Sequence, residues 1–171
     1  MNWLEKIDFM IAADKSGEYT GKLLIDITVT KNKWQPYELE NIIKSYPWLP
    51  KEYINFIKKY DNIGIAWVVF YGSEAGDIIP LGKEIEELRE YGLSKDYFPF
   101  GKGPGGEVYA FNKKGEVIYF ASDDYEFENP HIIAKDFDDF MNNRLFKDRI
   151  ANCESSKSTS FYEFLKLQGW V

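Results

Sequence analysis

The densest group of chemically capable side chains is an acidic segment in the last third of the chain, consisting of Asp123, Asp124, Tyr125, Glu126, Phe127 and Glu128. The spacing lacks the D-x-D-x-D-G pattern and the twelfth-position glutamate of a calcium loop. Paired carboxylates also carry out hydrolysis, but their separation cannot be read from a sequence. We therefore favour a solvated loop or an acidic contact surface over metal binding or catalysis. We expect Glu74 and Asp77 to extend this surface if their loop lies nearby.

A second pattern, the segment 101–106, matches the spacing G-x-G-x-x-G. In dinucleotide-binding proteins this motif opens a helix, whose N-terminal amides hold the pyrophosphate. Here Glu107–Phe111 follows and has the composition of a strand, and Pro104 removes one amide from the loop. The pattern predicts a flexible connection between two antiparallel strands, without a nucleotide cofactor.

The chain has one histidine, His131, and one cysteine, Cys153. A single cysteine cannot form an internal disulfide, and the paired ligands of a zinc site are absent. A catalytic triad would depend on His131 alone, which stands between Pro130 and an apolar pair. We interpret this histidine as structural or solvent-facing, and predict a protein without catalytic residues, cofactor or metal.

Composition points to one globular domain with a protein partner. The chain has 171 residues, and 21 basic against 28 acidic residues give a net charge of −7. Nucleic-acid binders need a basic face, so nucleic acid is an unfavourable direct partner, whereas a basic protein surface is a favourable one. Aromatic residues make up 18% of the chain. They indicate an aromatic core, with exposed tyrosine or tryptophan at an interface as the alternative.

Nothing in the sequence predicts a membrane or export segment. Charges at Glu5, Lys6 and Asp8 interrupt any apolar run at the N-terminus. The longest uncharged stretch, Asn62–Ser73, has 12 residues, and a transmembrane helix needs about 20. We expect a cytoplasmic protein without membrane contact.

Hydrophobic periodicity predicts a mixture of helices and strands. The expected helices cover residues 2–13, 37–45, 51–60, 83–91, 136–145 and 160–168. The expected strands cover residues 23–30, 66–71, 77–81, 97–100, 107–111 and 116–121, and a polar loop is expected over 147–158. Pro36 is expected at the start of the second helix, and the strand 66–71 is expected to be central because it is apolar on both faces.

Three of these segments, in this order, resemble the SMI1/KNR4 (SUKH) superfamily. Leu49–Asn62 is similar to its "LP-x-x-Y-x-x-F" opening, and Tyr97–Phe111 is similar to its strand, glycine-rich loop and strand. Ala134–Met141 is similar to its "A-x-S-F-x-E-F-L" helix, with Asp136 where serine is common. Asn62-Ile63-Gly64 replaces the frequent Gly-Gly. The resemblance covers residues 37–146 most closely, and residues 1–30 and 147–171 lie outside it.

The resemblance implies an α+β fold, with a mixed, mostly antiparallel sheet flanked by helices in a single domain over residues 1–171. Bacterial members are mostly immunity proteins that bind polymorphic toxins, often nucleases; fungal relatives are scaffold-like regulators. It implies a non-catalytic immunity protein that occludes the active site of a basic toxin such as a nuclease domain, with a scaffold or regulatory binding module as the alternative. The shared motif residues are expected in the core: Leu49, Pro50, Tyr53, Phe56, Phe137 and Phe140.

Overall fold

The computed structural model describes residues 1–16, 27–30, 33–76, 79–149 and 160–171. Its centre is an antiparallel sheet whose seven strands follow one another in chain order, and every neighbouring pair is antiparallel. The strands are β1 (Ile27–Thr30), β2 (Asp61–Ile65), β3 (Val68–Phe70), β4 (Tyr97–Lys102), β5 (Val108–Asn112), β6 (Val117–Phe120) and β7 (His131–Ala134). The predicted α+β class is therefore confirmed; the parallel pairing in these residues is an isolated bridge between Gly72 and Pro80.

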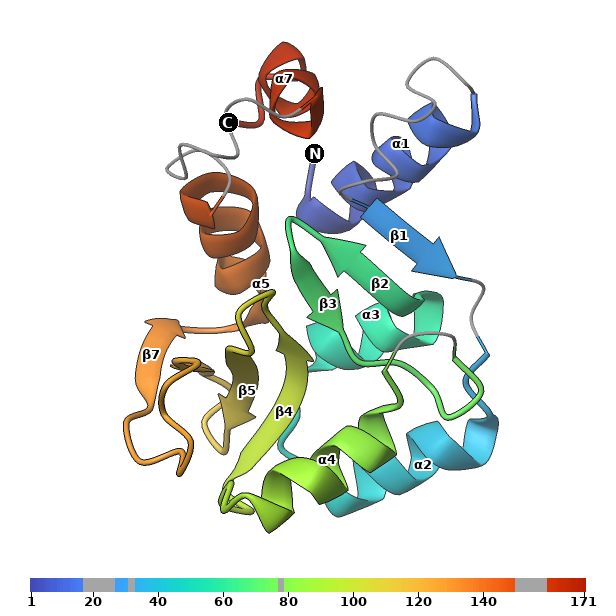
Figure 1. Ribbon diagram of the computed structural model, residues 1–171. Helices are drawn as coiled ribbons and strands as arrows, with labels where there is room; N and C mark the ends of the chain where they lie inside the picture. Colours follow the sequence, from blue (N-terminus) through green and yellow to red (C-terminus); the bar gives the residue numbers. More distant parts are fainter. Residues whose placement is uncertain (17–26, 31–32, 77–78, 150–159) are drawn as a thin grey trace.

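Helices flank this sheet, as Figure 1 shows, with α2 and α4 towards one end of the molecule and α1 and α7 towards the other. The helices are α1 (Trp3–Lys15), α2 (Pro36–Ser45), α3 (Lys51–Lys59), α4 (Leu81–Glu90), α5 (Phe137–Asp139), its π-helical continuation η1 (Phe140–Arg149), and α7 (Ser160–Leu167). Pro36 begins α2 as predicted. Among the described residues, the helices all fall short of the combined length and apolarity that a membrane span requires.

The core is built from aromatic rings that α3, α5 and the sheet contribute. In α3, Tyr53, Phe56 and Ile57 recur at the spacing that places side chains on one helix face, and all three are buried. The Phe137 ring lies 5.6 Å from the rings of both Tyr53 and Phe56 and 5.9 Å from that of Phe100. Burying one such ring contributes about 1.5–3 kcal/mol. The predicted aromatic core is confirmed.

The motif residues behave largely as predicted. Leu49, Tyr53, Phe56, Phe137 and Phe140 are buried. The exception is Pro50, which is half-buried because it stands just before the first turn of α3. A proline suits this place, since the first amide of a helix lacks an intrahelical acceptor in any case.

The predicted central strand over 66–71 is wrong in its boundaries, because a hairpin occupies this region. β2 and β3 pair directly from Ile65 to Val68, so Ala66 and Trp67 form a two-residue turn. Both have positive φ, 51° and 64°, a conformation that turns of this length usually fill with Asn-Gly or Gly-Gly. Residue preferences therefore do not indicate this turn, and β2 is not among the predicted strands.

Other boundaries also differ from the predictions. The strand over 77–81 is wrong at its end, because Leu81 is the first residue of α4, and residues 77–78 lie outside the described part. β7 was not predicted. The loop over 147–158 begins too early, since η1 continues to Arg149; residues 150–159 lie outside the described part. Of the strand 23–30, residues 27–30 are confirmed as β1 and the rest is not described.

Candidate protein-binding surface

The acidic segment lies in the loop that joins β6 to β7, and Asp124 holds this loop together. Its carboxylate accepts the backbone N–H groups of Glu128 at 3.0 Å and of Asn129 at 2.9 Å. The N–H of Asp124 itself donates to the carbonyl of Ala121 at 3.1 Å. Short acidic side chains commonly organise turns in this way. The Asp124 side chain therefore organises the turn of this loop.

Phe127 anchors the same loop to the sheet. Its backbone has a positive φ of 54°, and its half-buried ring meets Phe120 of β6 edge-on at 5.2 Å. The neighbouring Tyr125, in contrast, is 79% exposed. The loop thus buries one aromatic side chain and presents the other to solvent.

Three further carboxylates of the loop, those of Asp123, Glu126 and Glu128, are exposed. Within the part of the chain that the structure describes, none of them takes part in an ion pair. Their charge is therefore available to a partner. The segment Asp123–Glu128 is referred to below as the acidic loop.

A depression of about 390 Å³ adjoins the acidic loop. It lies between this loop, β5 and the end of α4, and we call it the aromatic hollow. Leu88, Tyr91, Val108, Asp124, Tyr125 and Phe127 are among the residues that line it. Tyr91, directly after α4, is 63% exposed, whereas Leu88 and Val108 are buried. The hollow is therefore lined by two buried apolar side chains and two exposed tyrosines.

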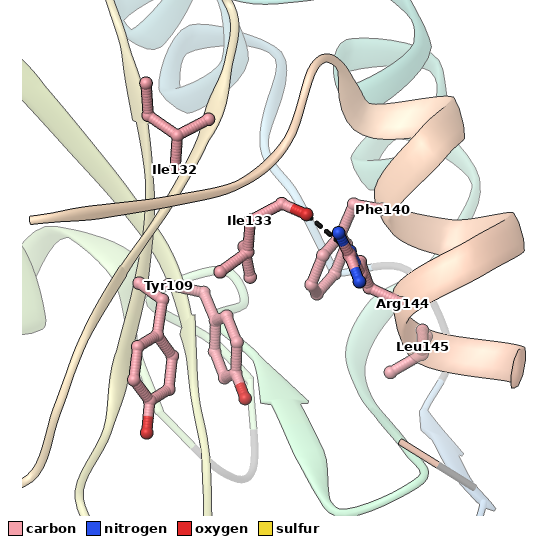
Figure 2. Close-up of a pocket in the computed structure, with 7 residues that line it drawn as sticks. Tyr109, Ile132, Ile133, Phe140, Arg144 and Leu145 are labelled. Atoms are coloured by element: carbon pink, nitrogen blue, oxygen red, sulfur yellow. Dashed lines mark hydrogen bonds between the residues drawn. The ribbon is translucent and has the colours of Figure 1, made fainter. Parts of the chain in front are cut away.

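A second hollow, also of about 390 Å³, lies between the edge strand β7 and η1 (Figure 2). Tyr109, Ile133 and Phe140 line it, together with Arg144, whose Nε donates to the Ile133 carbonyl at 2.5 Å. Ile133 is the extra residue where the register between β6 and β7 shifts, so Arg144 satisfies a carbonyl that the bulge leaves unpaired. This hydrogen bond links β7 to η1.

Glu74 and Asp77 were predicted to extend the acidic surface, and the structure places Glu74 elsewhere. Glu74 accepts the N–H of Gly82 at 3.1 Å and so caps the first turn of α4, and its own N–H donates to Glu38 at 3.0 Å. The aromatic hollow lies at the opposite end of α4, which at 1.5 Å per residue is about 15 Å long. Glu74 is thus not brought together with the acidic loop. Asp77 lies outside the described residues.

Sequence reasoning missed a second acidic site, which faces inward. Asp61, at the start of β2, is 1% exposed. Its carboxylate accepts the Ser73 N–H at 2.8 Å, the Ser73 hydroxyl at 2.6 Å, the Lys33 N–H at 3.0 Å and the Asn62 amide at 2.9 Å. The Asp61 carboxylate thus accepts four hydrogen bonds. Because two of them come from Ser73, the carboxylate stabilises the loop after β3. Buried Asp61, Asn62 and Ser73 are called the inward polar cluster below.

Two glycines make room for this cluster. A Cβ atom at Gly76 would lie 1.7 Å from the Asn62 amide nitrogen, and one at Gly72 would lie 2.3 Å from an Asp61 carboxylate oxygen. The sequence offered one signal for this cluster: Asp61-Asn62 precedes an apolar stretch, and Gly72 and Gly76 follow that stretch. Among the described residues, no group of three His, Cys, Asp or Glu side chains is placed to hold a metal ion. His131 is exposed on β7, as predicted.

Comparison with models of protein families gives a match. The model of the SMI1 / KNR4 family (SUKH-1) matches residues 17–143, which is most of the chain. No curated protein matches the sequence. The matched range contains the acidic loop, the aromatic hollow and the inward polar cluster.

Proposed function

Since the chain belongs to the SMI1/KNR4 family (SUKH-1), we propose that it is a non-catalytic immunity protein, which binds a cognate protein toxin in the cytoplasm and neutralises it. Members of this family are generally non-catalytic proteins of this kind. The observation that carries the proposal is the acidic loop, whose exposed carboxylates have no ion-pair partner in the described residues and stand beside exposed tyrosines.

The charge of the molecule supports a basic target. The chain carries a net charge of −7, and opposite charge on two proteins raises the rate at which they meet. A nuclease toxin has a basic groove for its substrate backbone, and an acidic loop inserted there would exclude the substrate. Tyrosines next to the carboxylates would then slow dissociation, because aromatic side chains are the frequent anchors of interfaces.

The first experiment is co-purification of the chain with the product of the neighbouring gene, followed by growth rescue of cells that express that product. Stable association together with rescue is the expected result. Binding to a partner that does not impair growth would instead assign the chain to scaffold or regulatory modules. Product formation by the chain alone on nuclease, esterase or glycosidase substrates would contradict a non-catalytic role.

The second experiment tests the surface with charge reversal at Asp123 and Glu126. Both are exposed, and neither side chain makes a hydrogen bond to another described residue. The double variant D123K/E126K is expected to lower the association rate with the toxin about tenfold or more and to flatten its salt dependence. The matched control is E40K/E52K, which changes the net charge equally at exposed positions of α2 and α3. Equal affinity and salt slope in both variants would remove the acidic loop from the interface.

A further inference from the structure

The aromatic hollow combines features that fit one kind of side chain. Its floor is apolar, since Leu88 and Val108 are 7% and 5% exposed. Its lining includes the exposed side chains of Tyr91 and Tyr125, which come from different parts of the chain, one from directly after α4 and one from the acidic loop. At about 390 Å³ the hollow lies in the range of small-ligand sites, so its volume accommodates a long side chain in contact with the lining.

The charge around the hollow selects a cation. Asp124 lies in its wall, and Asp123, Glu126 and Glu128 are exposed next to it. The Asp124 carboxylate already accepts two backbone N–H groups, but a carboxylate offers about four acceptor positions and so retains capacity. Arg89, in the last turn of α4, donates instead to the carbonyls of Leu93 and Tyr97, and it does not line the hollow.

Arginine matches this environment better than lysine or an apolar side chain. Its planar guanidinium stacks on the faces of tyrosine rings and donates two parallel hydrogen bonds to a carboxylate. Its methylene stem can lie along the apolar floor while the charged end stays at the acidic rim. Lysine offers a point charge without the planar face, and an apolar side chain leaves the acidic rim without a counter-charge.

We infer that the aromatic hollow receives an arginine side chain of the protein partner, held between Tyr91 and Tyr125 with its guanidinium at the carboxylates of the acidic loop. This deepens the proposed function, on which it rests for the identity of the partner as a toxin. The arginine contact itself does not require the toxin to be known, so it is tested separately.

The probe is N-acetyl-arginine amide, titrated into the full chain labelled with ¹⁵N and followed by backbone amide shifts. Saturable shifts are expected at Gly106, Tyr125 and Phe127, at or next to the lining of the hollow. The citrulline analogue has the same shape without charge, and the lysine analogue has charge without the planar fork. Both are expected to bind at least tenfold more weakly.

The variants Y91A and Y125A are each expected to weaken arginine binding about threefold to tenfold, in line with the usual strength of a cation–π contact. The control is Y37A on α2, a tyrosine that is 62% exposed, much like Tyr91, and does not line the hollow. A thermal melt of each variant checks that the fold is retained.

The inference is overturned by an absence of saturable shifts, by equal binding of the citrulline or lysine analogue, or by equal binding of Y91A, Y125A and Y37A. Its failure is distinguishable from that of the proposed function. If the D123K/E126K variant no longer binds the toxin while Y91A and Y125A bind it at full affinity, the hollow does not bind an arginine of the toxin. The proposed immunity function is then unaffected. If arginine binds as described but no toxin does, the immunity role fails and the arginine site stands.

Discussion

Asp61 and Asp123 each begin a pair of neighbouring polar residues, Asp61-Asn62 and Asp123-Asp124, but their surroundings are opposite. Asp61 is 1% exposed and accepts four hydrogen bonds, whereas Asp123 faces water and has no ion-pair partner in the described residues. A buried carboxylate is tolerable only when its acceptor positions are filled. An exposed one is under no such constraint and remains available for an intermolecular contact.

The density of acidic residues along this chain therefore does not indicate which of them have a structural role. The inward polar cluster joins residues from β2 and from the loop after β3, and it accepts an N–H group from the segment before α2, so the groups that meet there are distant in sequence. The acidic loop is contiguous and contains both kinds of residue, because Asp124 organises the loop and its neighbours do not. Three substitutions test this division.

The largest effect is expected for D61A. Removing this carboxylate leaves the buried Ser73 N–H group, the half-buried Lys33 N–H group and the buried Asn62 amide without their acceptor. Because unpaired buried polar groups cost about 1–3 kcal/mol each, we expect the free energy of unfolding to fall by about 3 kcal/mol or more, measured by urea denaturation. A loss below about 1 kcal/mol would show that the inward polar cluster does not hold the loop after β3.

A smaller loss is expected for G76A. The added Cβ would lie 1.7 Å from the Asn62 amide, so that either this side chain or the loop must shift, at a cost of about 1–3 kcal/mol. The matched control is G64A in β2, where a Cβ meets nothing within 4 Å. We expect the control to be neutral or slightly more stable in the same denaturation assay. Equal stability of the two variants would contradict the close packing around the cluster.

The smallest of the three effects separates residues within the acidic loop. D124A removes the acceptor for two exposed backbone N–H groups, and we expect a loss of about 1 kcal/mol. D123A, one residue away, is expected to stay within about 0.5 kcal/mol of the natural chain, as exposed substitutions usually do. Hydrogen exchange at Glu128 and Asn129 provides the local measurement. Exchange that is equally slow in both variants would mean that Asp124 does not organise the loop.

Much of the fold could be predicted because its signals are local. The buried face of α3 follows from the spacing of Tyr53, Phe56 and Ile57, and the hairpin after β5 follows from a turn that ends in Gly115, whose φ is 81°. The hairpin at Ala66-Trp67 could not be predicted in this way, since neither residue prefers positive φ. There the pairing of β2 with β3 imposes the turn.

For the candidate surface, the sequence alone determined the identity and order of the acidic loop, the overall negative charge and the family to which the chain belongs. The tertiary structure decided the rest: that Tyr91 and Tyr125 line the same hollow, that Glu74 caps the first turn of α4 at the end about 15 Å from the hollow, and that Asp61 is buried. The physical reason is that burial and proximity depend on which distant segments pack together. Residue preferences depend only on the local sequence, so they do not indicate contacts between distant segments.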